Sequence, residues 1–158
     1  MAAASPGPGQ PGPGQRLFQI VRFWSRRWTG AGQGADLDNA RMVMVTEAVL
    51  ALQGGPGATV NAVANELGID QSGASRMIAQ AEAAGYLRKA PGQSDARQRA
   101  LHVTPAGEDL LAAAHAWQEA VFASLTAGWD AEDVQRLAGY LARLQAAQAD
   151  GRQPSPRA

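Results

Sequence analysis

The 158-residue sequence contains no cysteine and only two histidines, His102 and His115. The absence of cysteine excludes disulfides, zinc–thiolate sites, thiol nucleophiles and thiol redox sensing, and two histidines leave little material for a metal site. No apolar run approaches the roughly 18 residues that a membrane-spanning helix needs. The N-terminus lacks the basic start and the apolar stretch of a secretory signal. We therefore expect a cytoplasmic protein without a metal or another cofactor.

The chain also lacks an excess of charge, because 14 Lys and Arg residues balance 14 Asp and Glu residues. This balance excludes a protein that binds nucleic acid through bulk positive charge. The charges are nevertheless unevenly distributed. Residues 72–103 carry five basic and two acidic side chains, whereas residues 104–150 carry two basic and seven acidic ones. A locally basic segment therefore lies within a neutral chain.

The two ends of the chain have few residues that can form a core. Residues 6–15 read Pro-Gly-Pro-Gly-Gln twice, without an aliphatic or aromatic side chain. Such a composition does not offset the entropy lost on ordering. We expect residues 1–14 and 151–158 to be disordered tails, and residues 15–150 to form a single domain.

Between these tails, apolar residues recur at steps of three and four positions, which is typical of amphipathic helices. One helix, about 38–52, is apolar almost all round, and this indicates a central, buried position. Two short stretches, Tyr86–Lys89 and Arg99–Val103, read as strands of a hairpin because Pro91-Gly92 forces a turn between them. The other expected helices span residues 15–29, 60–67, 71–84, 105–125 and 131–148. The predicted fold class is mostly α with a small β-hairpin wing (α+β).

The helix ends carry recognisable signals. Thr59, Asp70 and Asp130 are expected N-caps, since their side-chain oxygens can accept hydrogen bonds from free amides of the first turn. Thr104 precedes Pro105, and proline is well suited to the first helical position. Gly68 is placed to end the helix 60–67.

Two short helices joined by a glycine-centred turn and followed by a hairpin have the order of a winged helix-turn-helix. At 100° per residue, the expected helix 71–84 has an apolar side formed by Ala74, Met77, Ile78 and Ala81. Its opposite side is small and polar, with a single arginine, Arg76. Such a face suits close approach to a major groove, and the helix N-terminus attracts phosphate.

These residues resemble the MarR family of transcriptional regulators. The resemblance rests on an ordered set of motifs with intact spacing: Thr59-Val60, Glu66-Leu67-Gly68-Ile69, Ser75-Arg76-Met77-Ile78, Gly85-Tyr86-Leu87-Arg88-Lys89, Asp95-Ala96-Arg97 and Val103-Thr104-Pro105-Ala106-Gly107. It covers about Thr59 to Gly107, and flanking helices extend it over most of residues 15–148. The sequence departs from the family at Ala79 and Gln80, where members often carry an Asp-Arg pair.

The resemblance implies a winged helix-turn-helix at about 38–104, between dimerisation helices at 15–29 and 104–148. It also implies that the helix 71–84 reads the major groove and that Arg97, held by a salt bridge from Asp95, reaches the minor groove. The residues that we expect to contact DNA are Gln71, Ser72, Ser75, Arg76, Gln80, Arg88, Lys89, Arg97 and Arg99.

In relatives, a cleft between the dimer interface and the DNA-binding lobe often holds a small anionic or aromatic effector. The residues that would line such a pocket here are Trp24, Trp28, Met42, His115 and Trp117. The same residues have a simpler interpretation as dimer core and packing, because aromatic stripes usually mean burial. Both interpretations stay open at the level of sequence.

The sequence therefore predicts a sequence-specific regulator of transcription, with repression as the default, that binds double-stranded DNA as a homodimer on a palindromic operator. Release by a small effector is expected from the resemblance. An alternative is a winged-helix dimer that binds a protein partner or ligand without reading DNA. An enzyme is not expected, because no nucleophile–base arrangement or metal cluster is implied by the spacing.

Overall fold

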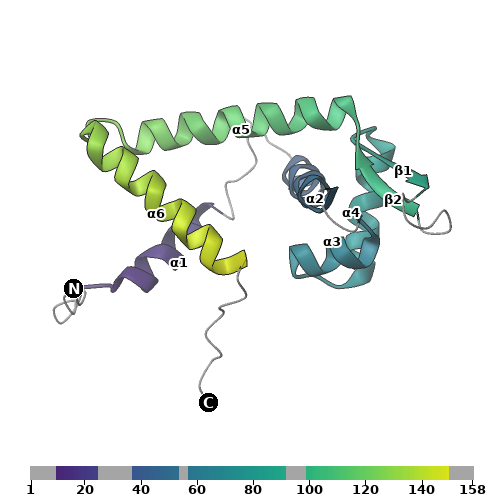
Figure 1. The fold of residues 1–158 in the computed structure, drawn as a ribbon, viewed down its shortest axis with the longest axis horizontal. Coiled ribbons are helices and arrows are strands. Elements are labelled where there is room, and N and C mark those ends of the chain that lie inside the picture. Colours follow the sequence, from purple (N-terminus) through teal and green to yellow (C-terminus); the bar gives the residue numbers. More distant parts are fainter. Residues whose placement is uncertain (1–9, 25–36, 54–56, 92–98, 150–158) are drawn as a thin grey trace, which may run out of the picture. The chain divides into compact units, whose positions relative to one another are not determined.

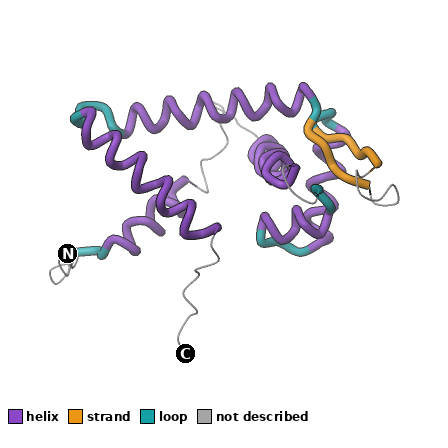
Figure 2. The backbone as a smooth tube through the Cα atoms, viewed as in Figure 1, coloured by secondary structure: helices purple, strands orange, loops and turns teal. Residues whose placement is uncertain are grey.

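A computed structural model describes residues 10–24, 37–53, 57–91 and 99–149 of the chain. The described elements, in chain order, are α1 (Pro13–Trp24), α2 (Leu37–Gln53), α3 (Val60–Leu67), α4 (Gln71–Ala83), β1 (Leu87–Pro91), β2 (Arg99–Val103), α5 (Pro105–Leu125) and α6 (Ala131–Ala149) (Figure 1). The chain divides into two compact units, residues 1–118 and 119–158, and each is considered by itself. The predicted mixture of helices with one hairpin is confirmed (Figure 2).

The first helix starts two residues before its predicted position. Gly12 precedes α1, and its amide donates to the side-chain oxygen of Gln15 at 3.0 Å. Pro13 occupies the first helical position, where its missing N–H costs no hydrogen bond. The Pro-Gly-Gln repeat, expected to lie in a tail, thus supplies a helix start at its second copy. The predicted end of this helix, near residue 29, lies outside the described residues.

Helix α2 forms the centre of the first unit, as its apolar composition predicted. Val45 and Val49 are fully buried, and Ala48 and Met42 are nearly so. The helix packs against α3, α4 and β2. It therefore connects the helix-turn-helix with the hairpin. The hydroxyl of Thr46 is also buried and has no hydrogen-bond partner among the described residues.

The α3–α4 pair forms the two helices of the helix-turn-helix, and its caps agree with the sequence signals. The hydroxyl of Thr59 accepts from the amide of Ala62 at 3.2 Å, which fixes the start of α3. Gly68 ends α3 in the left-handed conformation, with φ of +64°, a region that glycine adopts without steric cost. Three residues, Gly68, Ile69 and Asp70, separate the two helices, so the turn between them is short.

The two strands form an antiparallel hairpin in which Leu87 pairs with Val103 and Lys89 with Leu101. Strand β1 is displaced by about one residue from the expected 86–89, whereas β2 agrees with its prediction. Leu101, with 1% of its surface exposed, also forms an antiparallel bridge to Ala58. The hairpin is therefore attached to the core through β2 and the residue before the cap of α3.

Thr104 joins the wing to the start of α5 and to the turn after α4. Its hydroxyl accepts from the amide of Gly107 at 3.1 Å and donates to the carbonyl of Gly85 at 2.6 Å. The predicted cap is thus confirmed, and the same hydroxyl also satisfies a carbonyl beyond the end of α4. Gly107 is buried at this junction, where a Cβ atom would come within 2.4 Å of the Tyr86 carbonyl oxygen.

The second unit contains the end of α5 and all of α6. The Thr126 hydroxyl donates to the carbonyl of Phe122 at 2.9 Å, and Gly128 then turns the chain with φ of +84°. Helix α6 leaves Tyr140, Leu141 and Leu144 exposed. None of the described helices is long and apolar enough to cross a membrane.

Replacing Gly107 with alanine should destabilise the protein, because the new methyl group would meet backbone at 2.4 Å rather than a side chain that can move. Overpacking of this kind costs about 1–3 kcal/mol. Urea unfolding followed by circular dichroism measures the difference. The matched control is Gly139→Ala in α6, where nothing lies within 4 Å; it should leave stability unchanged or raise it. Equal stability of the two variants would contradict the tight junction.

Candidate nucleic-acid interface

The surface that the sequence assigns to DNA is the outer face of α4. Ala74, Ile78 and Ala81 are at most 1% exposed and face the core. On the opposite side, Arg76 and Gln80 are exposed. The predicted division of the helix into a buried and a free face is therefore confirmed.

The N-terminus of α4 is capped by the exposed carboxylate of Asp70. One carboxylate oxygen accepts from the amide of Gly73 at 2.8 Å and also from the hydroxyl of Ser72. The hydroxyl of Ser72 and this amide hold the pKa of Asp70 below its usual value, because both hydrogen bonds favour the charged form. This helix end was expected to attract phosphate through its positive partial charge. The negative charge of the Asp70 carboxylate offsets part of that attraction.

The two basic residues of β1, Arg88 and Lys89, differ in whether a described residue forms an ion pair with them. Lys89 forms an ion pair with Glu82 of α4, with 2.6 Å between Nζ and the carboxylate oxygen. Arg88 is exposed, and within the described part of the chain it has no hydrogen bond or ion pair. Lys89 therefore ties the end of α4 to β1, whereas none of the described acidic side chains pairs with Arg88.

The turn between the strands lies outside the described residues. This concerns Asp95 and Arg97, with their predicted salt bridge, and the side chain of Arg99, whose backbone belongs to β2. Their assignment to DNA stays a prediction from the sequence.

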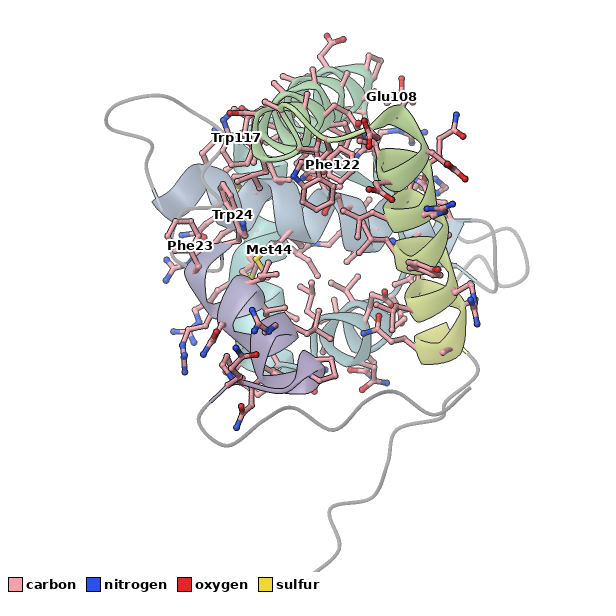
Figure 3. The ribbon with its side chains drawn as sticks, turned by 90° about the vertical axis from the view of Figure 1, so that its left-hand side faces the viewer. Phe23, Trp24, Met44, Glu108, Trp117 and Phe122 are labelled. Atoms are coloured by element: carbon pink, nitrogen blue, oxygen red, sulfur yellow. The ribbon has the colours of Figure 1, made fainter. Side chains whose placement is uncertain are left out.

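The residues expected to line an effector pocket lie in different surroundings. Trp24 and Trp117 are half-buried and meet edge to face, with 6.1 Å between ring centroids (Figure 3). His115 contacts Glu47 of α2, with 3.0 Å between Nε2 and the carboxylate oxygen. Met42 belongs to the core around α2, and Trp28 lies outside the described residues. The structure thus brings Trp24 and Trp117 together and places Met42 in the core.

Among the described residues, no group of three or more His, Cys, Asp or Glu side chains is arranged to hold a metal ion. The ion pair Glu82–Lys89 and the contact of Ser72 with Asp70 were not predicted from the sequence. The contact of Ser72 with Asp70 could have been predicted in part, because Asp70 was expected to cap α4 and precedes Ser72 by two positions.

The helix-turn-helix, the exposed second helix and the hairpin define a winged helix-turn-helix protein. The predicted resemblance is confirmed, since the model of the MarR family matches residues 44–98, which include most of α2 and all of α3, α4 and β1. Residues 44–98 are thus similar to the MarR family, whose members are transcriptional regulators. No curated protein sequence matches the chain.

Solved structures share the fold at low sequence identity. MepR of S. aureus bound to ethidium bromide has a TM-score of 0.57 and 16% identity, and the match covers 84% of this chain and 94% of that one. PcaV of Streptomyces coelicolor, in complex with its natural ligand, has a TM-score of 0.56 and 19% identity, over 94% and 99% of the two chains. BpsR of Bordetella bronchiseptica has a TM-score of 0.52 and 20% identity, over 83% and 98%.

The Asp70 cap predicts a specific dependence of stability on pH. Because the pKa of Asp70 is lower in the folded chain than in the unfolded one, its contribution is present above the unfolded pKa and is lost as pH falls through the folded pKa. Asp70→Asn keeps a capping oxygen without a titrating charge. Urea midpoints measured from neutral to strongly acidic pH should therefore fall more steeply for the wild type than for Asp70→Asn. Parallel profiles would show that the carboxylate makes no favourable contact in the folded state.

Proposed function

We propose that this protein is a DNA-binding regulator of transcription that acts as a homodimer on a palindromic operator, and that it represses its targets. The single observation that carries the proposal is the exposed outer face of α4, presented by a helix-turn-helix within the segment that matches the MarR family. A helix that packs on one side and is small and polar on the other can enter a major groove. MepR, which shares the fold, has also been solved as a complex with DNA.

The proposal of a dimer is supported by apolar surface at both ends of the chain. In α1, none of the residues is buried, and the large apolar side chains of Phe18, Ile20 and Val21 are more than half exposed. In the second unit, Tyr140 and Leu144 of α6 are about half exposed. Large apolar side chains exposed on a helix in this way indicate an interaction site. A second copy of the chain is the partner that would also duplicate α4 for a two-fold symmetric operator.

An effector that releases the DNA is a further part of the proposal. Two proteins of the same fold are described with small ligands: PcaV with its natural ligand, and BpsR through regulation of its DNA binding by 6-hydroxynicotinic acid. Here, the contact of Trp24 with Trp117 and that of His115 with Glu47 both join α5 to another helix of its unit. A ligand that alters these contacts would change how α5 holds the wing and α4.

Selection of bound duplexes from a random DNA pool tests the function. We expect a palindrome with half-sites about one helical turn apart. Binding to this sequence should weaken steeply with salt, by roughly 10³-fold between 50 and 200 mM if about six phosphates are contacted. A protein that selects no sequence and ignores duplexes at low salt would instead favour the alternative, a winged-helix dimer that binds a protein partner.

Arg97→Ala tests the assignment of the wing to DNA. We expect this variant to bind the selected operator more weakly by about 1–3 kcal/mol, because it removes a cation from the narrow minor groove, where negative potential is concentrated. Fluorescence anisotropy with labelled operator gives the affinity, and sedimentation reports whether the variant assembles as the wild type does. An unchanged affinity would remove Arg97 from the interface.

A further inference from the structure

The outer face of α4 offers few groups that could read bases. Ser72, Ala79 and Ala83 are all exposed, but their side chains are short. Arg76 and Gln80 are exposed as well, and they project long polar side chains from the same face. Gln71 is also exposed, but it lies about 140° from Arg76 around the helix axis. The face therefore presents two long hydrogen-bonding side chains on a background of small ones.

Neither side chain is bound by another residue that the structure describes. Within the described part of the chain, neither Arg76 nor Gln80 has a hydrogen bond or ion pair. Their neighbours differ in this respect, because Ser72 donates to Asp70 and Glu82 binds Lys89. Arg76 and Gln80 are thus the two long polar side chains on the outer face of α4 that no described residue binds.

The spacing of these two residues matches the spacing of bases. They are one helical turn apart, which corresponds to about 6 Å along the axis. Successive base pairs are separated by about 3.4 Å, so a helix that follows the groove places the two side chains about two base-pair steps apart. Small neighbours at Ala79 and Ala83 allow the backbone of α4 to approach the base edges.

We propose that Arg76 reads a guanine and that Gln80 reads an adenine about two base-pair steps away in the same half-site. This inference rests on the proposed DNA-binding function and adds the identity of the bases. The guanidinium of Arg76 would donate two hydrogen bonds to O6 and N7 of guanine. The amide of Gln80 would donate to N7 of adenine and accept from its N6 amino group. Each such pair discriminates against a wrong base by roughly 5- to 150-fold.

The decisive variant is Gln80→Glu, because a carboxylate accepts hydrogen bonds but cannot donate one to adenine N7. A carboxylate is the acceptor that suits the N4 amino group of cytosine. We therefore expect the preference at one position of each half-site to change from adenine to cytosine, while the guanine preference stays. Base preference is taken from sequence selection at a single salt concentration, so that a uniform loss of affinity does not affect the result.

Two further variants make the assignment specific. Gln80→Ala should lose the adenine preference without gaining another, and Arg76→Ala should lose the guanine preference alone. The control is Gln135→Ala, an exposed glutamine of α6 on the side opposite Leu137 and Leu141; it should select the same sequence as the wild type. Circular dichroism verifies that each variant is folded.

The possible outcomes separate this inference from the function on which it rests. A wild-type protein that selects no sequence overturns both. A wild-type motif that persists unchanged in Gln80→Glu and Gln80→Ala overturns the reading by Gln80 but leaves the regulator intact. A loss confined to adenine in Gln80→Ala, with a change to cytosine in Gln80→Glu, supports the proposed reading.

Discussion

The burial of one face of α4 against the core around α2 sets the orientation of the helix-turn-helix. Ala74, Ile78 and Ala81 are almost completely buried, and two of the three are alanines, so α4 lies close to its support. A rotation of α4 by one residue would turn this apolar side towards water and bring polar groups into the core, where each unpaired group costs free energy. The direction in which Arg76 and Gln80 point is therefore set by packing that neither residue takes part in.

The candidate interface has few polar side chains that remain available to bind a ligand. Several polar groups near α4 are used within the chain: the Asp70 carboxylate holds the helix N-terminus, and Glu82 neutralises Lys89. These contacts order the helix-turn-helix and the wing, but they also reduce the number of donors that remain for a ligand. In the proposed dimer, two-fold symmetry would double the number of these donors.

The junction around Thr104 shows how the parts of the first unit are connected. One hydroxyl caps α5 and also binds the carbonyl of Gly85, and the absence of a side chain at Gly107 lets α5 approach the Tyr86 carbonyl. The wing, the end of α4 and the start of α5 consequently meet at one point. In the proposed regulator, this junction is where a change in α5 would reach the surface that contacts DNA.

The amino-acid sequence was sufficient to predict the features that depend on near neighbours along the chain. The caps at Thr59 and Asp70, the turn at Gly68 and the two faces of α4 were all predictable, because each follows from side chains within about four positions. The start of α1 at Pro13 was missed, since the repeat that contains it reads as a tail. Which polar groups bind one another, among the residues that the structure describes, depends on how the elements pack and could not be predicted in this way. The ion pair of Glu82 with Lys89, the contact of His115 with Glu47 and the place of Met42 in the core join residues that are distant in sequence or lie on different elements. Periodicity gives the face of a helix on which such a residue lies, but its partner is chosen by how the elements pack.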